Sequence, residues 1–276
     1  MVHFCNLFDS DGRGAAMRAG GLLQAEGSAN APVLVCNLTK TFLDESRGVI
    51  RAVDGISFEC RESEVFGLLG ANGAGKTTTL RMLSTIIAPT SGTARILGRD
   101  IVKDPSGVRR SMGFYSASTA LYPRLTARET IEFFARINQY PEDKVQERVD
   151  ALITRFGIAD YAGVRVEKLS TGMKQKVSIA RTVAHNPLIV IFDEPTIGLD
   201  VLNALEVQRA IQELRSDGRT IIFSTHIMSE AEKLCDRIAI IHKGRILACD
   251  TLAGLRETTG QHYLEDIFLR YVRGPS

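Results

Sequence analysis

Short runs of almost uniformly apolar residues recur along the chain, and each ends at a polar or turn-forming residue. The three clearest, at 65–69, 188–192 and 220–224, predict strands covered on both faces, because neither face of such a run is polar. Weaker apolar patterns predict strands at 33–38, 56–58, 93–97 and 111–115, a polar hairpin or loop at 44–48, and a hairpin of 237–241 with 245–249.

The stretch from about 120 to 186 has the pattern of helices instead. Thr126 and Glu129 form a capping box, a signal that opens a helix. Pro141 suits the first turn of a second helix, and Ser170 suits the N-cap of a third. We therefore predict a helical subdomain inserted into a chain that otherwise alternates strands and helices.

Two more helices are predicted after the strand at 188–192. Apolar residues fall on one face of 201–215, and Asp217-Gly218 ends that helix. A second capping box, Ser229 with Glu232, predicts the start of the other. Strands that alternate with helices predict an α/β fold with a mainly parallel sheet, and a ligand at the carboxyl ends of its strands.

A glycine-rich segment joins the strand at 65–69 to a helix and has the pattern G-x-x-x-x-G-K-T. It consists of Gly70, Ala71, Asn72, Gly73, Ala74, Gly75, Lys76 and Thr77, and Thr78 follows it in the helix. The glycines let successive N–H groups point into one concavity, where the helix N-terminus adds partial positive charge. Lys76 then reaches the β- and γ-phosphates, and the Thr77 hydroxyl ligates Mg²⁺. A chance glycine-rich turn is the alternative, but the flanking strand and helix favour binding of a nucleoside triphosphate.

Two adjacent carboxylates end the strand at 188–192. Phosphoryl transfer needs a Mg²⁺ anchor opposite the phosphate loop, and a strand-end Asp193 supplies one. Glu194 is then placed to polarise an attacking water. By themselves the two residues are better interpreted as carboxylates in a solvated turn. The phosphate loop reverses that preference.

Composition excludes several classes of protein. The 276-residue chain has a net charge of +2 with acids and bases interspersed, so no nucleic-acid partner is expected. Its five cysteines lack C-x-x-C spacing and are interpreted as reduced thiols. No apolar run approaches the roughly 18–20 residues that a membrane span needs, and no signal peptide is visible, so a soluble intracellular protein is expected. Residues 1–31 are expected to be a flexible N-terminal extension.

Two further motifs carry a family resemblance. Residues 169–176 read L-S-T-G-M-K-Q-K, and residues 191–200 read I-F-D-E-P-T-I-G-L-D. From about residue 33 to the C-terminus the chain resembles the nucleotide-binding subunit of an ABC transporter. The first motif, with the run at 119–129, resembles more narrowly the ATPases of sodium-extrusion (Nat-type) exporters. The resemblance implies one P-loop ATPase domain at 32–276, with an antiparallel β subdomain and an inserted helical subdomain beside the parallel core.

The same resemblance implies roles for residues outside the phosphate loop. Phe42 matches the aromatic that stacks on adenine, although an ordinary core aromatic is the alternative. Ser170 and Gly172 match the signature that completes the γ-phosphate site of the opposite subunit, although Ser170 also suits a plain helix cap. Asp200 matches a loop that crosses the dimer interface, and His226 matches a histidine that contacts the γ-phosphate.

The chain also departs from the family pattern. Ala117 stands where the family has a glutamine that touches Mg²⁺ and relays to the membrane partner, so the metal must take a water there or use Ser116 or Ser118. Thr171 and Met173 replace a glycine and a glutamine of the commoner signature, and Thr171 brings a β-branched side chain to a position of close backbone approach.

We therefore expect a Mg²⁺-dependent ATPase, working as a homodimer or with a paralogue, that powers a separate membrane-spanning permease. It would be cytoplasmic and peripheral on the inner face of the membrane, with export the favoured direction. The expected dock for the permease is the surface near Tyr122, Phe133 and Phe134, whose alternative is burial inside the helical block.

Two rival functions fit the sequence less well. A soluble ABC-type ATPase of repair or translation usually carries a coiled-coil insertion or two ATPase halves, and neither is visible here. An unrelated P-loop kinase or GTPase would leave the signature helix unexplained, and the N-K-x-D guanine motif is absent from the sequence.

Overall fold

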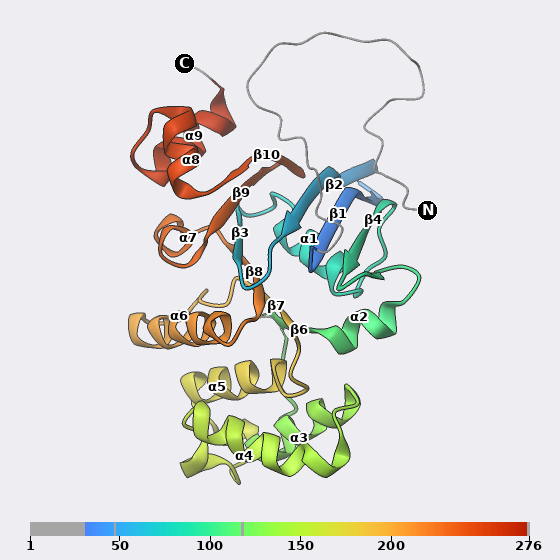
Figure 1. Cartoon of the computed structure of the whole chain (residues 1–276), viewed down its shortest axis with the longest axis vertical. Coiled ribbons are helices and arrows are strands. Elements are labelled where there is room, and N and C mark those ends of the chain that lie inside the picture. Colours follow the sequence, from blue (N-terminus) through green and yellow to red (C-terminus); the bar gives the residue numbers. More distant parts are fainter. Residues whose placement is uncertain (1–30, 47, 117–118, 275–276) are drawn as a thin grey trace.

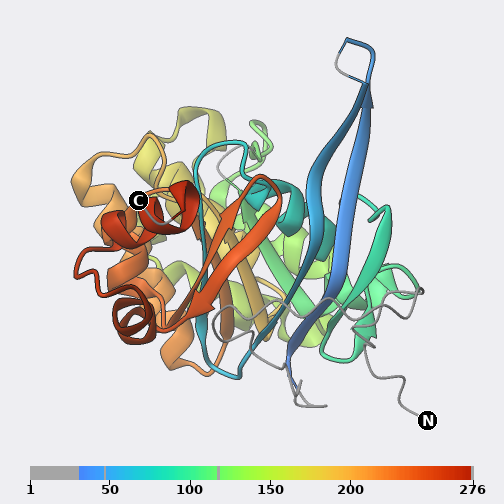
Figure 2. The ribbon, with the colours of Figure 1, turned by 90° about the horizontal axis from the view of Figure 1, so that it is seen from above.

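The computed structural model describes residues 31–46, 48–116 and 119–274, and places them in two sheets surrounded by helices (Figure 1). The first sheet is antiparallel, with the strand order β2-β1-β4-β5. Its strands are β1 (Val33–Asp44), β2 (Gly48–Cys60), β4 (Ser91–Ile96) and β5 (Arg99–Asp100). In Figure 2, β1 and β2 form a long ribbon whose turn projects beyond the body of the molecule. The hairpin predicted at 44–48 is this turn.

The second sheet has six strands in the order β10-β9-β3-β8-β7-β6, and only β10 runs antiparallel to its neighbour. The strands are β3 (Val65–Leu69), β6 (Met112–Ser116), β7 (Ile189–Asp193), β8 (Thr220–Thr225), β9 (Arg237–His242) and β10 (Arg245–Asp250). Every residue of β3, β7 and β8 is buried, which confirms the mainly parallel core. Because these three strands are parallel neighbours, their carboxyl ends meet at one edge.

Helix α1 (Lys76–Leu83) joins the two sheets. Its Leu80, Met82 and Leu83 are fully buried in a cluster that includes Val33 of the antiparallel sheet and Ile191 of the parallel one. Fixing both sheets on α1 also fixes the helix N-terminus, where the phosphate loop ends.

The helical block lies at one end of the molecule (Figure 1). It contains α3 (Ala127–Ile137), α4 (Val145–Arg155) and α5 (Thr171–Thr182), with single 3₁₀ turns at Glu142–Lys144, Ala159–Tyr161 and Val166–Lys168. The first capping box is confirmed: Thr126 Oγ1 accepts from the Glu129 N–H at 3.1 Å, and the Glu129 carboxylate accepts from the Thr126 N–H at 2.8 Å. Ser170 caps α5 by accepting from the Met173 N–H at 3.3 Å.

The remaining helices lie outside the helical block. They are α2 (Pro105–Ser111), α6 (Val201–Ser216), α7 (Met228–Leu234), α8 (Leu252–Thr259) and α9 (Leu264–Arg273). Leu255, Leu264 and Ile267 bury the C-terminal pair α8 and α9 against the β9 side of the sheet. The sequence pattern predicted neither this pair nor α2.

The second predicted capping box is wrong. Helix α7 begins at Met228 with Ile227 as its N-cap and has no side-chain cap, so Ser229 lies inside the helix. Thr225, at the end of β8, makes the side-chain hydrogen bonds at the start of this helix. Its hydroxyl donates to Glu230 at 2.8 Å and accepts from the Ile227 N–H at 3.0 Å.

Two other predictions need comment. The strand predicted at 111–115 is β6, which begins one residue later because Ser111 still belongs to α2. The predicted extension at 1–31 falls, apart from its last residue, outside the described residues, as do Ala117 and Ser118.

Candidate nucleotide site

The phosphate loop, residues 70–77, lies between the carboxyl end of β3 and the first turn of α1. Gly73 and Gly75 have φ values of 78° and 108°, a left-handed region that glycine enters without steric cost. A β-carbon on Gly70 would lie 2.4 Å from the Ile241 carbonyl oxygen, so the loop also curls too close to β9 for any side chain there. On the other side, the Gly244 N–H of the β9–β10 turn donates to the Ala74 carbonyl at 2.9 Å.

The loop forms one wall of an open pocket. The pocket is lined by Ala52, Asn72, Gly73, Gly75, Lys76, Thr77, Thr78 and Glu194. The structure therefore brings the predicted phosphate-binding residues together with one of the two predicted acidic residues. Ala52, a β2 residue that the motif does not include, contributes the opposite side.

Lys76 is almost completely buried at the floor of this pocket, with 4% of its surface exposed. Its Nζ donates to the carbonyls of Gly70 at 2.7 Å and Ala71 at 3.1 Å. The same ammonium lies 3.0 Å from Glu194 Oε1. A buried cation needs such partners, and the carboxylate places a negative charge beside the atom expected to contact phosphate.

Asp193 ends β7 beside the first turn of α1. Its Oδ1 accepts from the Thr77 hydroxyl at 3.2 Å and from the Ser224 hydroxyl at 2.7 Å. Burial raises the pKa of Asp193 above its ordinary value, although both hydrogen bonds oppose that shift. The Thr77 hydroxyl, in the first turn of α1, and the Asp193 carboxylate, at the end of β7, are thus within hydrogen-bonding distance of each other.

Glu194 has a left-handed backbone with φ of 47°, a conformation that costs a residue with a β-carbon on the order of 1 kcal/mol. Its N–H is held by Ser224, whose carbonyl and hydroxyl oxygens lie at 3.2 and 3.1 Å. Its Oε1 lies 3.3 Å from His226 Nδ1. Burial raises the pKa of Glu194, but Lys76 and then His226 outweigh that effect, so the pKa lies below its ordinary value. The carboxyl is therefore ionised near neutral pH.

Phe42 lies on the β1–β2 ribbon, opposite Ile50 in the strand register. Its ring is 42% exposed, so it is not a core aromatic. Lys40 Nζ lies 5.1 Å from the ring centroid and donates to the Ala88 carbonyl at 2.8 Å. Ala52, which lines the pocket, lies two residues after Ile50 on β2. Phe42 therefore pairs with a position close to the pocket.

Ser170, Gly172 and Asp200 do not line the described pocket and form a second group at the N-termini of α5 and α6. Asp200 caps α6 by accepting from the Asn203 N–H at 3.0 Å. A β-carbon on Gly172 would lie 2.4 Å from Asn203 Oδ1, so α5 and α6 are in close contact at this point.

One site residue escaped the sequence reasoning. Ser224 supports both acidic residues, and its signal was its place at the polar end of a predicted strand. Ser116, which the sequence reasoning offered as a substitute contact for the metal, ends β6 as the register partner of Asp193.

Comparison with known proteins agrees with this geometry. A family model described as ABC transporter matches residues 53–197. The chain belongs to the ABC transporter family. It is an ATP-binding, ATP-hydrolysing subunit of such a transporter, and its relatives support that function over a soluble ATPase of repair or translation. In the part of the chain that the structure describes, no helix is long and apolar enough to cross a membrane.

Similar proteins bear out the narrower resemblance as well. The ABC ATPase is 39% identical to the ABC transporter ATP-binding protein NatA of Bacillus subtilis, over 88% of this chain and 100% of NatA. It is 36% identical to the daunorubicin/doxorubicin resistance ATP-binding protein DrrA of Streptomyces peucetius, over 78% of this chain and 65% of DrrA.

Solved structures show the same fold. An ATP-binding subunit of an ABC transporter superposes with a TM-score of 0.78 at 28% identity, covering 87% of this chain and 99% of the other. The dimeric, post-hydrolysis cassette MJ0796 bound to ADP and Pi superposes with a TM-score of 0.72 at 26% identity, covering 79% and 98%.

Proposed function

We propose that two subunits, either two copies of this chain or this chain and a paralogue, close around two ATP molecules. In that dimer each phosphate loop faces the Ser170–Gly172 group of the opposite subunit. The supporting observation is that one chain holds two separate groups: a phosphate-binding pocket, and a capped helix end outside it. A helix N-terminus favours anions. The dimeric form of the similar cassette MJ0796 also supports this arrangement.

Within one site the side chains divide the work of hydrolysis. Lys76 and the loop N–H groups neutralise the β- and γ-phosphates, and Phe42 stacks on the adenine. Glu194, ionised and held between Lys76 and His226, accepts a hydrogen bond from the attacking water and orients it. His226, whose Nδ1 lies 3.3 Å from Glu194 Oε1, contacts the γ-phosphate from the same side. Asp200 crosses to the partner.

The residues present also fit Mg²⁺. Thr77 Oγ1 and Asp193 Oδ1 lie 3.2 Å apart, and Mg²⁺ prefers one or two such oxygens together with substrate phosphates and water. Bound there, Mg²⁺ would neutralise charge on the phosphates. Ser116, opposite Asp193, is suited to support its water shell.

Dilution tests the shared site. We expect ATP turnover per chain to fall as the purified protein is diluted, because a lone subunit lacks half of each site. Ser170→Ala should lower turnover at least about tenfold at every concentration and leave nucleotide binding to the monomer intact. ATPase rates across a dilution series, with sedimentation to follow the dimer, check both.

The control is Thr251→Ala, which removes an equivalent N-cap from α8, where Thr251 accepts from the Gly254 N–H at 3.1 Å. It should leave turnover unchanged. Turnover per chain that stays constant on dilution, with Ser170 dispensable, contradicts the shared site.

The relatives also support a proposal for the cargo and the direction of transport. We propose export, of sodium as in the Nat-type resemblance or of a drug as in the resistance protein DrrA. The chain would then lie on the cytoplasmic face of the membrane, bound to a permease.

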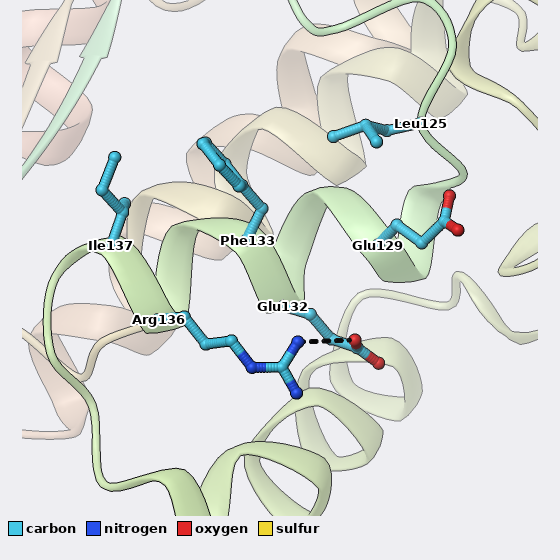
Figure 3. A pocket seen from close by; sticks show the side chains of 6 residues that line it. All are labelled: Leu125, Glu129, Glu132, Phe133, Arg136 and Ile137. Atoms are coloured by element: carbon cyan, nitrogen blue, oxygen red, sulfur yellow. Dashed lines mark hydrogen bonds and ion pairs between the residues drawn. The ribbon is translucent and has the colours of Figure 1, made fainter.

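The proposed dock for the permease is a hollow on α3. It is lined by Leu125, Glu129, Glu132, Phe133, Arg136 and Ile137 (Figure 3). Figure 3 shows Phe133 and Ile137 on one side of α3 and the ion pair of Arg136 with Glu132 on another. Tyr122, 51% exposed, packs edge-on to Phe133 with ring centroids 5.5 Å apart. Phe134 instead packs against the core. The surface thus combines exposed rings and charge, which suits a protein partner.

Tyr122→Asp should release the chain from membranes. A charge on this exposed ring disfavours an apolar contact, so the membrane-bound fraction in cells that hold the permease should fall at least about tenfold. The purified variant should keep its ATPase rate. Tyr263→Asp, on a tyrosine that is 64% exposed before α9, is the matched control and should remain bound. Equal membrane binding of both variants contradicts the dock.

A further inference from the structure

One side chain ties the segment that follows β7 to the helical block. The Tyr115 hydroxyl on β6 donates to Gln175 Oε1 at 2.8 Å, and Gln175 Nε2 donates to the Pro195 carbonyl at 2.9 Å. The amide of Gln175, on α5, is therefore a bridge with one end on a sheet strand and the other end on the residue after Glu194.

The Tyr115 end of the bridge is rigid. Only 2% of this residue is exposed, and its ring packs on Phe192 of β7 with centroids 5.6 Å apart. Both aromatic rings belong to the core cluster between the sheet and the helical block. The Pro195 carbonyl can only accept, so the NH₂ group of Gln175 must face it, and the Gln175 carbonyl oxygen accepts from the fixed Tyr115 hydroxyl.

The Pro195 end of the bridge carries a strained turn. Glu194 is left-handed, with φ of 47°, so its backbone relaxes unless contacts on both sides hold it. Ser224 holds its N–H, and the hydrogen bond from Gln175 holds the next carbonyl along the chain. Relaxation of this turn would move the Glu194 carboxylate away from Lys76, 3.0 Å from it now.

Helix α5 also touches the first turn of α6, the helix that follows this segment. Gly172 lies against Asn203 of α6, and Gln175 is one turn further along the same face of α5. The helix capped by Ser170 thus contacts Pro195 at the start of the segment and α6 just beyond its end. A displacement of α5 acts on that segment through the bridge and through the Gly172 contact together.

We propose that Gln175 is a positioning residue for ATP hydrolysis, which holds the Glu194 turn in its working geometry and makes that geometry depend on the position of α5. The consequence is that engagement of the Ser170 helix end by the opposite subunit is felt at this chain's own Glu194. The inference rests on the role proposed for Glu194 above.

Gln175→Met keeps the length of the side chain and removes both hydrogen bonds. We expect kcat to fall at least about tenfold while the Kd for ATP stays within about twofold, because the pocket residues that bind phosphate are untouched. Gln175→Glu should be as impaired as Gln175→Met, since a carboxylate accepts from Tyr115 but cannot donate to Pro195. Tyr115→Phe should lower kcat less, and combining it with Gln175→Met should add nothing further.

Two matched controls separate this role from general packing. Gln208→Met removes a buried glutamine outside the bridge, which accepts from Lys233 at 2.8 Å. Tyr161→Phe removes the hydroxyl of another buried tyrosine, for which the described atoms supply no hydrogen-bond partner. Both variants should turn over ATP at the parental rate.

The outcomes are distinguishable. If Glu194→Gln is inactive while Gln175→Met turns over normally, the bridge is overturned and the role of Glu194 survives. If Gln175→Met lowers kcat and ATP affinity together, with a matching loss of Tm, the bridge is merely structural and the proposal is also overturned. If Glu194→Gln keeps full turnover, the proposed catalytic role itself is wrong.

Discussion

Glu194→Gln should stop turnover while ATP binding persists. The amide keeps the shape of the side chain but cannot accept a proton or carry the charge that faces Lys76 and His226. General-base catalysis contributes about 10²–10⁴-fold, so we expect kcat to fall by that factor. ATP should then hold two subunits together, because the closed dimer keeps its ATP when hydrolysis is blocked. Phosphate release gives the rate, and size-exclusion chromatography with ATP shows the dimer.

The matched control is Glu206→Gln. Glu206 also pairs with a lysine, Lys176, at 3.1 Å, but in a partly exposed ion pair between α6 and α5. Its amide variant should keep the parental turnover, because exposed ion pairs contribute little. Turnover retained by Glu194→Gln would remove Glu194 from its proposed role.

Lys76→Ala should weaken nucleotide binding itself. The variant loses the cation at the pocket floor and leaves the Gly70 carbonyl and Glu194 without their donor. A charge-assisted hydrogen bond contributes about 1.5–3 kcal/mol, so the Kd for ATP should rise about 10- to 150-fold. Titration calorimetry measures it.

Lys233→Ala is the comparison, because Lys233 donates to Gln208 Oε1 from α7 and lies outside the pocket. Its Kd should match that of the parent. An unchanged Kd in Lys76→Ala would show that the backbone of the loop alone holds the phosphates.

The parts of the site that depend on neighbours in sequence were predictable. The phosphate loop follows a strand and leads directly into a helix, so its location can be read from the local sequence alone. The position of Asp193 opposite the loop was also predictable, because phosphoryl transfer needs a Mg²⁺ anchor there and a strand-end carboxylate supplies one.

Features that depend on tertiary neighbours were not predictable. The box at Ser229 met the local rule, but the chain enters α7 earlier, and Thr225 supplies the hydrogen bonds from the preceding strand. Gln175 lies within a recognised motif, yet its proposed role depends on hydrogen bonds with Tyr115 and Pro195, which are 60 and 20 residues away in the sequence. Helices α8 and α9 were missed because their apolar faces make sense only against β9.

The phosphate loop does not shape itself alone. Gly70 lies directly against the Ile241 carbonyl, and the Ala74 carbonyl accepts a hydrogen bond from the Gly244 N–H. A segment about 170 residues downstream therefore helps to fix the shape of the loop. A truncated chain that stopped before β9 would retain every residue of the glycine motif and still lack the surface that bends it. Ribosomal synthesis must therefore pass β9 and the β9–β10 turn before this enzyme acquires a nucleotide-ready cradle.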